Sequence, residues 1–164
     1  MGRPPKQAGV NLGALSLPGA LDLEVRRYVY DVAIARGAPP TSQQAAADLG
    51  VSVDQVRAAF ERLAAAHVLV VQRETREILM AMPFSALETP FPTRVGETTY
   101  HGNCAWDALG IAAMLKQDAR IDTTCGCCSF PMSLRVAAES LEPAAGVVHF
   151  AVPARRFWDN IVFT

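Results

Sequence analysis

Apolar residues recur at helical spacing through the first third of the chain, and this pattern predicts three helices. The first, DLEVRRYVYDVAIARG, ends at Gly37, which suits a helix C-cap. Its predicted buried face consists of Leu23, Val25, Val29, Val32 and Ala33. The second, TSQQAAADLG, has a Thr41/Ser42 cap, and the third, SVDQVRAAFERLAAAHVL, opens with a capping box from Ser52 to Gln55.

Strand-like apolar runs follow these helices. Val68 to Val71 and Ile78 to Met82 flank a polar tip, which is typical of a β-hairpin. Three helices followed by a hairpin predict a winged helix-turn-helix-like domain over residues 21–83. Glycine and proline without periodicity predict a flexible N-terminal arm over residues 1–20.

A proline-rich stretch, PFSALETPFPTRVGE, predicts a linker over residues 84–97. Residues 98–164 then predict a second domain, with a first strand at Thr98 to Tyr100 and a helix, NCAWDALGIAAMLKQ, capped by Asn103. Further strands are predicted in ARIDTTC, MSLRVAAESL, AGVVHFAVPA and NIVFT, with GCCSFP as a turn. The expected fold is α+β: an N-terminal three-helix, winged-helix-like domain and a C-terminal mixed-sheet domain with a candidate catalytic helix.

Composition and charge fit a soluble globular protein and disfavour some partners. The 164 residues are 51% hydrophobic and 19% charged, with a net charge of −1, so no global field attracts nucleic acid or an anionic membrane. The predicted recognition helix, Ser52 to Ala65, mixes acidic and basic residues, which disfavours DNA binding. The N-terminus does not resemble a secretory signal, and no run reaches the ~18 apolar residues of a membrane span. We therefore expect a cytoplasmic protein without a membrane partner.

All four cysteines fall within twenty-five residues: Cys104, Cys125, Cys127 and Cys128. In a reducing compartment such a group is more often catalytic or metal-binding than disulfide-bonded. A zinc site is disfavoured because His67, His101 and His149 show no paired spacing. A thioredoxin-like motif would need a helix after the C-x-x-C, whereas Pro131 and a predicted strand follow here. Handling of a soft, thiophilic metal is the better general interpretation.

Cys104 and Asp107 lie three residues apart at the predicted start of a helix, so their side chains share one face. The helix N-terminus is expected to favour a thiolate at Cys104. Apolar neighbours such as Trp106 are expected to keep Asp107 protonated longer. A soft nucleophile beside a proton donor is one interpretation; a purely structural pair in a first helical turn is the other.

The residues NCAWDALGIAAMLKQDARIDTTC, followed by PMSLRV and VVHFAVP, resemble the organomercurial (alkylmercury) lyases, over about residues 22–164. The resemblance implies cleavage of a carbon–mercury bond by protonolysis, without an organic cofactor and with a mercury ion as bound product. It implies that Cys104 binds mercury, that Asp107 carries the proton, and that Cys125 is structural. Implied partners are an organomercurial substrate, external thiols and a mercuric reductase as product acceptor.

One feature departs from the family pattern, which has a second catalytic cysteine after the VVHFAVP region. The corresponding residues here, Phe157 to Asn160, contain no thiol. Three explanations stay open: a truncated chain, with a selenocysteine codon after Thr164 as one specific form, replacement of the ligand by Cys127 or Cys128, or loss of activity.

Two other functions compete with the lyase. One is a soft-metal sensor or scavenger, in which the four cysteines bind metal and the winged helix reads DNA. The other is a C-x-x-C oxidoreductase using Cys125 and Cys128. The preferred organomercurial and the oligomeric state are not indicated by the sequence.

Overall fold

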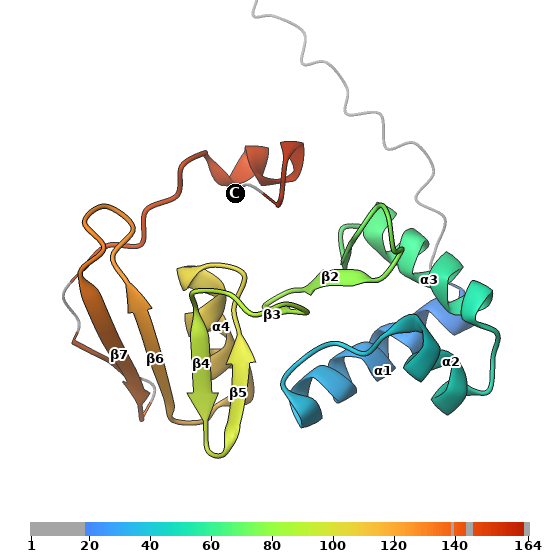
Figure 1. Ribbon diagram of the computed structural model, residues 1–164, viewed down its shortest axis with the longest axis horizontal. Coiled ribbons are helices and arrows are strands. Elements are labelled where there is room, and N and C mark those ends of the chain that lie inside the picture. Colours follow the sequence, from blue (N-terminus) through green and yellow to red (C-terminus); the bar gives the residue numbers. More distant parts are fainter. Residues whose placement is uncertain (1–18, 139, 144–145, 163–164) are drawn as a thin grey trace, which may run out of the picture.

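The computed structural model describes residues 19–138, 140–143 and 146–162. The predicted arm over residues 1–20 falls almost entirely outside this range. Among the described residues the fold is α+β, with three N-terminal helices followed by a sheet domain (Figure 1), as the sequence predicted. No helix in the described part of the chain is long and apolar enough to span a membrane.

The three N-terminal helices are α1 (Ala20–Arg36), α2 (Ser42–Leu49) and α3 (Val53–Ala65). The predicted capping box of Ser52 with Gln55 begins α3, and the predicted Thr41 cap of α2 is part of a second capping box, with Gln44. Gly37 ends α1 in the left-handed region, at φ 88°, as expected of a C-cap.

The predicted buried face of α1 is wrong at one position. Leu23 is 53% exposed, whereas its neighbour Asp22 is buried and accepts hydrogen bonds from Arg62 at 2.6–3.0 Å and from the Gly19 N–H at 3.0 Å. An acid can occupy this position because its charge is paired. The other four residues of the predicted buried face of α1 are buried, so the hydrophobic pattern was wrong only at Leu23.

A small antiparallel sheet packs beside the helices, in the order β1 (Val70–Val71), β2 (Ile78–Ala81), β3 (Phe84–Ser85). The predicted hairpin is thus present, with shorter strands. The shared core of helices and sheet includes Val25, Val29, Val56, Phe60, Leu63, Leu69 and Ile78. The label winged helix stays a prediction.

Three arginines, two on α3 and one in the β1–β2 turn, are paired with acids. The ion pairs are Arg57–Glu77 at 3.3 Å, Arg62–Asp22 at 2.6 Å and Arg76–Glu61 at 2.7 Å. Cations that already have carboxylate partners are less able to neutralise phosphates. This pairing supports the expectation that DNA is not a partner, which stays a prediction.

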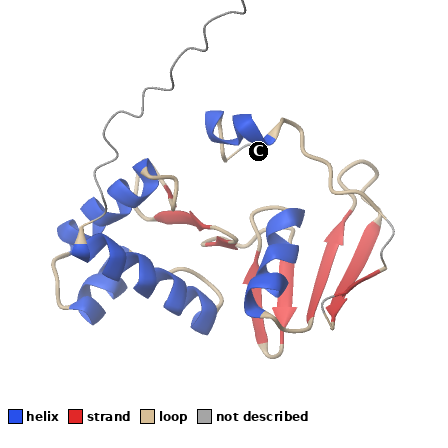
Figure 2. Cartoon of the chain, turned by 180° about the vertical axis from the view of Figure 1, so that it is seen from behind, coloured by secondary structure: helices blue, strands red, loops and turns tan. Residues whose placement is uncertain are grey.

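The second sheet has five antiparallel strands in the order β5-β4-β6-β7-β8. Their bounds are β4 (Pro92–Val95), β5 (Thr98–His101), β6 (Ala119–Thr124), β7 (Pro131–Ala137) and β8 (Ser140–Glu142). Helix α4 (Ala105–Leu115) covers one face of the β4–β5–β6 region, as Figures 1 and 2 show from opposite sides. The core beneath it includes Phe84, Val95, Tyr100, Ile111 and Ala112, together with Ala33 of α1.

Three sequence predictions in this half need correction. Residues 84–97, expected to be a linker, hold β3 and β4 instead; Pro92 is tolerated because it is the first residue of its strand. The stretch MSLRVAAESL is a hairpin of β7 and β8 rather than one strand. The pairings of the described strands are all antiparallel, so the sheet is not mixed in direction.

The C-terminal segment also differs from its prediction. Residues 146–153 form no strand, and a 3-10 helix, η1 (Ala154–Asp159), follows. Figure 1 shows this segment arching from the sheet toward the helical half. There Trp158 stacks on His67, with ring centroids 3.9 Å apart. Of the predicted strand NIVFT, residues 160–162 lie outside any strand, and residues 163–164 are not described.

Candidate active site

Helix α4 begins directly after Cys104, which occupies the N-cap position with extended backbone angles (φ −151°, ψ 179°). Its carbonyl accepts the first helical hydrogen bond from Ala108, at 3.0 Å. The predicted cap, Asn103, is therefore one residue too early. The Asn103 side-chain amide instead donates hydrogen bonds to Asp107 Oδ2 at 3.0 Å and to the Pro83 carbonyl at 3.2 Å.

Asp107 is half-buried in the first turn of α4. Burial raises the pKa of this carboxyl, and hydrogen bonds from Asn103 and from the Cys104 side chain pull the pKa part of the way back. The direction agrees with the sequence expectation that Asp107 holds a proton longer than an exposed aspartate. Asn103, placed four residues before it, holds the carboxylate by a hydrogen bond to Oδ2.

Cys104 differs from its prediction in one respect. Burial raises the pKa of its thiol and outweighs the backbone N–H groups of Asp107 and Trp106, which lower it. The Asp107 carboxylate adds to the rise, both by its charge and by accepting a hydrogen bond from the thiol. Cys104 therefore keeps its proton to a higher pH than an exposed thiol does.

Close backbone packing fixes the start of this helix against the sheet. A Cβ on Gly102 would lie 2.6 Å from the amide nitrogen of Ala108 and 2.9 Å from its Cα. Thr89 Oγ1 donates to the Gly102 carbonyl at 2.6 Å, and the Gly102 N–H donates to the Phe91 carbonyl at 3.0 Å. These contacts set the position of Cys104 and Asp107 relative to β4 and β5.

An apolar groove lies next to the pair. The Trp106 ring is 60% exposed and meets Phe150 edge-on, with centroids 6.2 Å apart, and Phe150 contacts Phe157 at 5.3 Å. The groove has a volume of about 610 Å³, and its apolar lining comes from Trp106 and from residues 148–154 and 157. His149 also lines it. The C-terminal segment thus covers the N-terminal end of α4 instead of adding strands.

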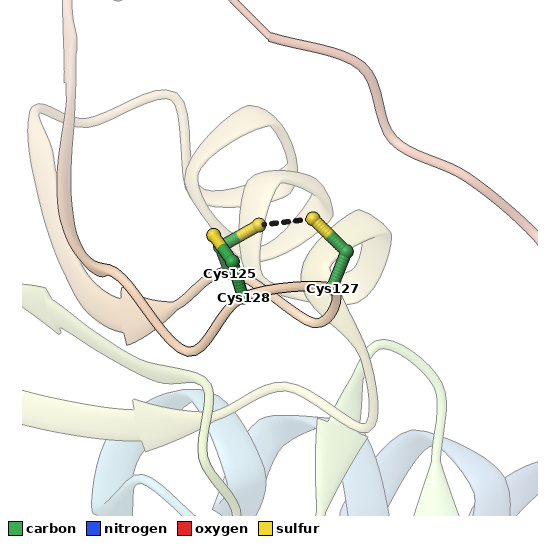
Figure 3. A group of neighbouring side chains, drawn as sticks. All are labelled: Cys125, Cys127 and Cys128. Carbon is green, nitrogen blue, oxygen red and sulfur yellow. Dashed lines mark hydrogen bonds between the residues drawn. The ribbon is translucent and has the colours of Figure 1, made fainter.

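The other three cysteines gather in the turn between β6 and β7 (Figure 3). Their sulfur atoms all lie within 4.8 Å of one another, and Cys125 Sγ is 3.1 Å from Cys127 Sγ. Hydrogen bonds from the Cys127 thiol and from the backbone N–H groups of Cys127 and Cys128 lower the pKa of Cys125 to about 7. The pKa of Cys127 is raised, because its proton is donated to Cys125.

The cysteine turn and the start of α4 lie at the same edge of the sheet. Strands β5 and β6 both pair antiparallel with β4, one on each side, so both end at that edge. Cys104 follows the end of β5, and Cys125 follows the end of β6. Thr123 Oγ1 donates to the Pro90 carbonyl at 2.8 Å and ties the end of β6 to the segment before β4. Cys104 itself is not part of the three-sulfur group.

Comparisons with known proteins bear on this half of the chain. Residues 84–164 match the MerB family model, described as alkylmercury lyase. This part of the chain belongs to the alkylmercury lyase family. The family match begins at Phe84, inside the segment that was predicted to be a linker.

A solved structure described as the mercury-bound form of MerB2 supports the fold. The two chains have a TM-score of 0.60 and 20% sequence identity, and the alignment covers 77% of this chain and 61% of the other. This chain therefore spans less than two thirds of the length of that lyase structure. At this identity the likeness shows the fold alone. No curated protein matches the sequence.

The structure places Cys104 and Asp107 together at the start of α4, at the positions that the sequence predicted. The sequence prediction missed Asn103 as a partner of Asp107, although the i,i+4 spacing of an amide and a carboxylate was a usable signal. It also missed Phe150, because the contact with Trp106 depends on how the C-terminal segment folds back. The roles of Cys104, Asp107, Cys125, Cys127 and Cys128 stay predictions.

Proposed function

We propose that this chain is an alkylmercury lyase that cleaves carbon–mercury bonds by protonolysis. One observation carries the proposal: Cys104 at the N-cap and the half-buried Asp107 in the first turn lie together at the start of α4, and burial raises the pKa of both groups. The pair joins a soft ligand for mercury to a group that can hold a proton. The membership of residues 84–164 in the alkylmercury lyase family supports the same chemistry.

The reaction starts with transfer of the thiol proton. When an organomercury cation, R–Hg⁺, binds Cys104, the S–H bond breaks, an S–Hg bond forms, and the proton moves to Asp107. The raised pKa of Asp107 favours this transfer, since its buried carboxyl accepts a proton more readily than an exposed one.

Cleavage then returns the proton to carbon. The electron pair of the C–Hg bond forms the new C–H bond with the proton from Asp107, so R–H leaves and mercury stays on sulfur. No electrons are gained or lost, and no organic cofactor is needed. Asp107 ends as a carboxylate, ready for the next thiol proton.

A second thiolate on mercury would weaken the bond to carbon by raising the electron density on the metal. We propose that Cys127 or Cys128 supplies it, because both are exposed and lie on the turn at the same sheet edge as Cys104. The organic group R would lie in the apolar groove beside Trp106 and Phe150. External thiols would then remove the mercuric ion, with a mercuric reductase as the product acceptor in the cytoplasm.

Benzene release from a phenylmercury salt with excess monothiol tests the proposal. We expect Cys104→Ser to abolish release and Asp107→Asn to slow it by about 10²- to 10⁴-fold, the usual contribution of a general acid. The matched control is Asp31→Asn, an exposed aspartate on α1 that pairs with Arg27, which should not change the rate. Unchanged release in Cys104→Ser would refute the assignment.

A further inference from the structure

The turn between β6 and β7 holds three sulfur atoms close together, and backbone hydrogen bonds within the turn fix its shape. The Cys125 N–H donates to the Phe130 carbonyl, and the Ser129 N–H donates to the Cys125 carbonyl, both at 2.8 Å. These bonds close the turn at the end of β6, so the sulfur atoms are brought together by local structure. Such preorganisation lowers the entropic cost of binding a ligand.

The sulfur spacing suits one central ion. Three thiolates in a plane around a metal, at a bond length of ~2.3 Å, lie ~4 Å from one another. The sulfur atoms of Cys125, Cys127 and Cys128 already lie within 4.8 Å of one another, and Cys127 points toward the other two in Figure 3. Small side-chain rotations are therefore enough to place all three on one ion.

The ligand set favours a soft ion. Thiolates select soft metals, whereas a structural zinc site requires four protein ligands. Within the described part of the chain, no fourth cysteine, histidine or carboxylate joins the group. Cys127 and Cys128 are exposed, so an ion can reach them from a neighbouring thiolate by ligand exchange.

We propose that Cys125, Cys127 and Cys128 form a three-thiolate mercuric-ion site that receives the mercury released at Cys104. That the ion comes from Cys104 rests on the proposed lyase function, whereas binding of a mercuric ion by the three thiolates does not depend on it. Transfer exchanges bonds only: each new S–Hg bond replaces a thiol proton, which passes to solvent. When the Hg–S bond to Cys104 breaks, that sulfur regains a proton. Donor and acceptor thiols follow β5 and β6, which end at the same edge of the sheet with β4 between them.

Titration of the full-length Cys104→Ser variant with mercuric chloride, against a competing monothiol, tests the site. We expect one mercuric ion per chain and the loss of three titratable thiols. Combining Cys127→Ser and Cys128→Ser with Cys104→Ser should lower the mercury affinity by about 10²- to 10⁴-fold, which is the usual gain from binding through several linked groups instead of one. Ser129→Ala, in the same turn, is the control and should bind as tightly as Cys104→Ser alone.

The site is refuted if the Cys104→Ser chain does not hold mercury against the monothiol, or if the two added serines change nothing. Because Cys127 and Cys128 are exposed, their serine variants should fold, and circular dichroism checks this. Benzene release by the unsubstituted chain separates the two proposals. If benzene is released but the turn does not bind mercury, the three-thiolate site is refuted and the lyase proposal stands. If the turn binds mercury but no benzene is released, the lyase proposal is refuted and the three-thiolate site stands.

Discussion

Gly102→Ala probes how the backbone positions the candidate site. The new Cβ would lie 2.6 Å from the Ala108 nitrogen, which is about 0.8 Å closer than the 3.4 Å at which ordinary contact begins. The neighbouring atoms are backbone atoms of α4, so no side chain can rotate to relieve the clash. The start of the helix, with Cys104 and Asp107, must therefore move away from the sheet.

Two effects of this shift can be estimated. Overpacking of this kind costs about 1–3 kcal/mol of unfolding free energy. A displacement approaching 1 Å at reacting groups lowers a rate by about 10²-fold. Urea unfolding of the full chain measures the first effect, and benzene release from a phenylmercury salt measures the second.

Gly110→Ala is the matched control within the same helix. Its Cβ would meet only the Pro83 Cβ, at 3.6 Å, and alanine is favoured over glycine in a helix by about 0.5–1 kcal/mol. We expect this variant to be at least as stable and as active as the original chain. Equal stability and activity of Gly102→Ala and Gly110→Ala would show that close packing at Gly102 does not position the start of α4.

Three other predictions concern charge, orientation and substrate size. Asp22→Asn should lower the unfolding free energy by about 2 kcal/mol near neutral pH in urea, because it breaks the charged bonds to Arg62. The pKa of Asp22 is lowered in the folded protein, so the carboxylate stabilises the fold at pH values above its ordinary pKa of 3.8. This stabilisation is lost as the pH falls through the lowered pKa, and the unfolding free energies of the variant and the original chain should then become equal. Asn103→Ala should slow benzene release and shift the pH–rate profile to higher pH. The hydrogen bond from the Asn103 amide lowers the pKa of Asp107, so its removal raises that pKa; an unshifted profile would contradict this role. Trp106→Ala should raise KM for phenylmercury more than for methylmercury, because the larger group uses more of the groove; equal effects on both substrates would argue against the groove.

Local signals explain what the sequence could predict. The Thr41 cap of α2 and the capping box of α3 depend on residues within one helical turn, and the structure contains both. The candidate pair Cys104 and Asp107 was found for the same reason, since three residues of one helical turn determine its geometry.

Long-range packing explains what the sequence missed. The apolar run at residues 146–153 has strand-like residues, yet Phe150 packs on Trp106 and no neighbouring strand pairs with the run. Pro92 suggested a linker, but it starts a strand that pairs with the next strand, β5, and with β6, which lies far along the chain. The helix N-terminus suggested a thiolate at Cys104, and burial, which the sequence did not indicate, outweighs it.

As a lyase, this chain would move a proton onto the carbon that leaves mercury. Incubation of the full chain with a phenylmercury salt and excess monothiol in deuterated water tests it, with mass spectrometry of the benzene and titration of the mercuric ion. We expect singly deuterated benzene and mercuric ion in equal amounts, both dependent on Cys104. Absence of benzene, or benzene formed equally by Cys104→Ser, would contradict it.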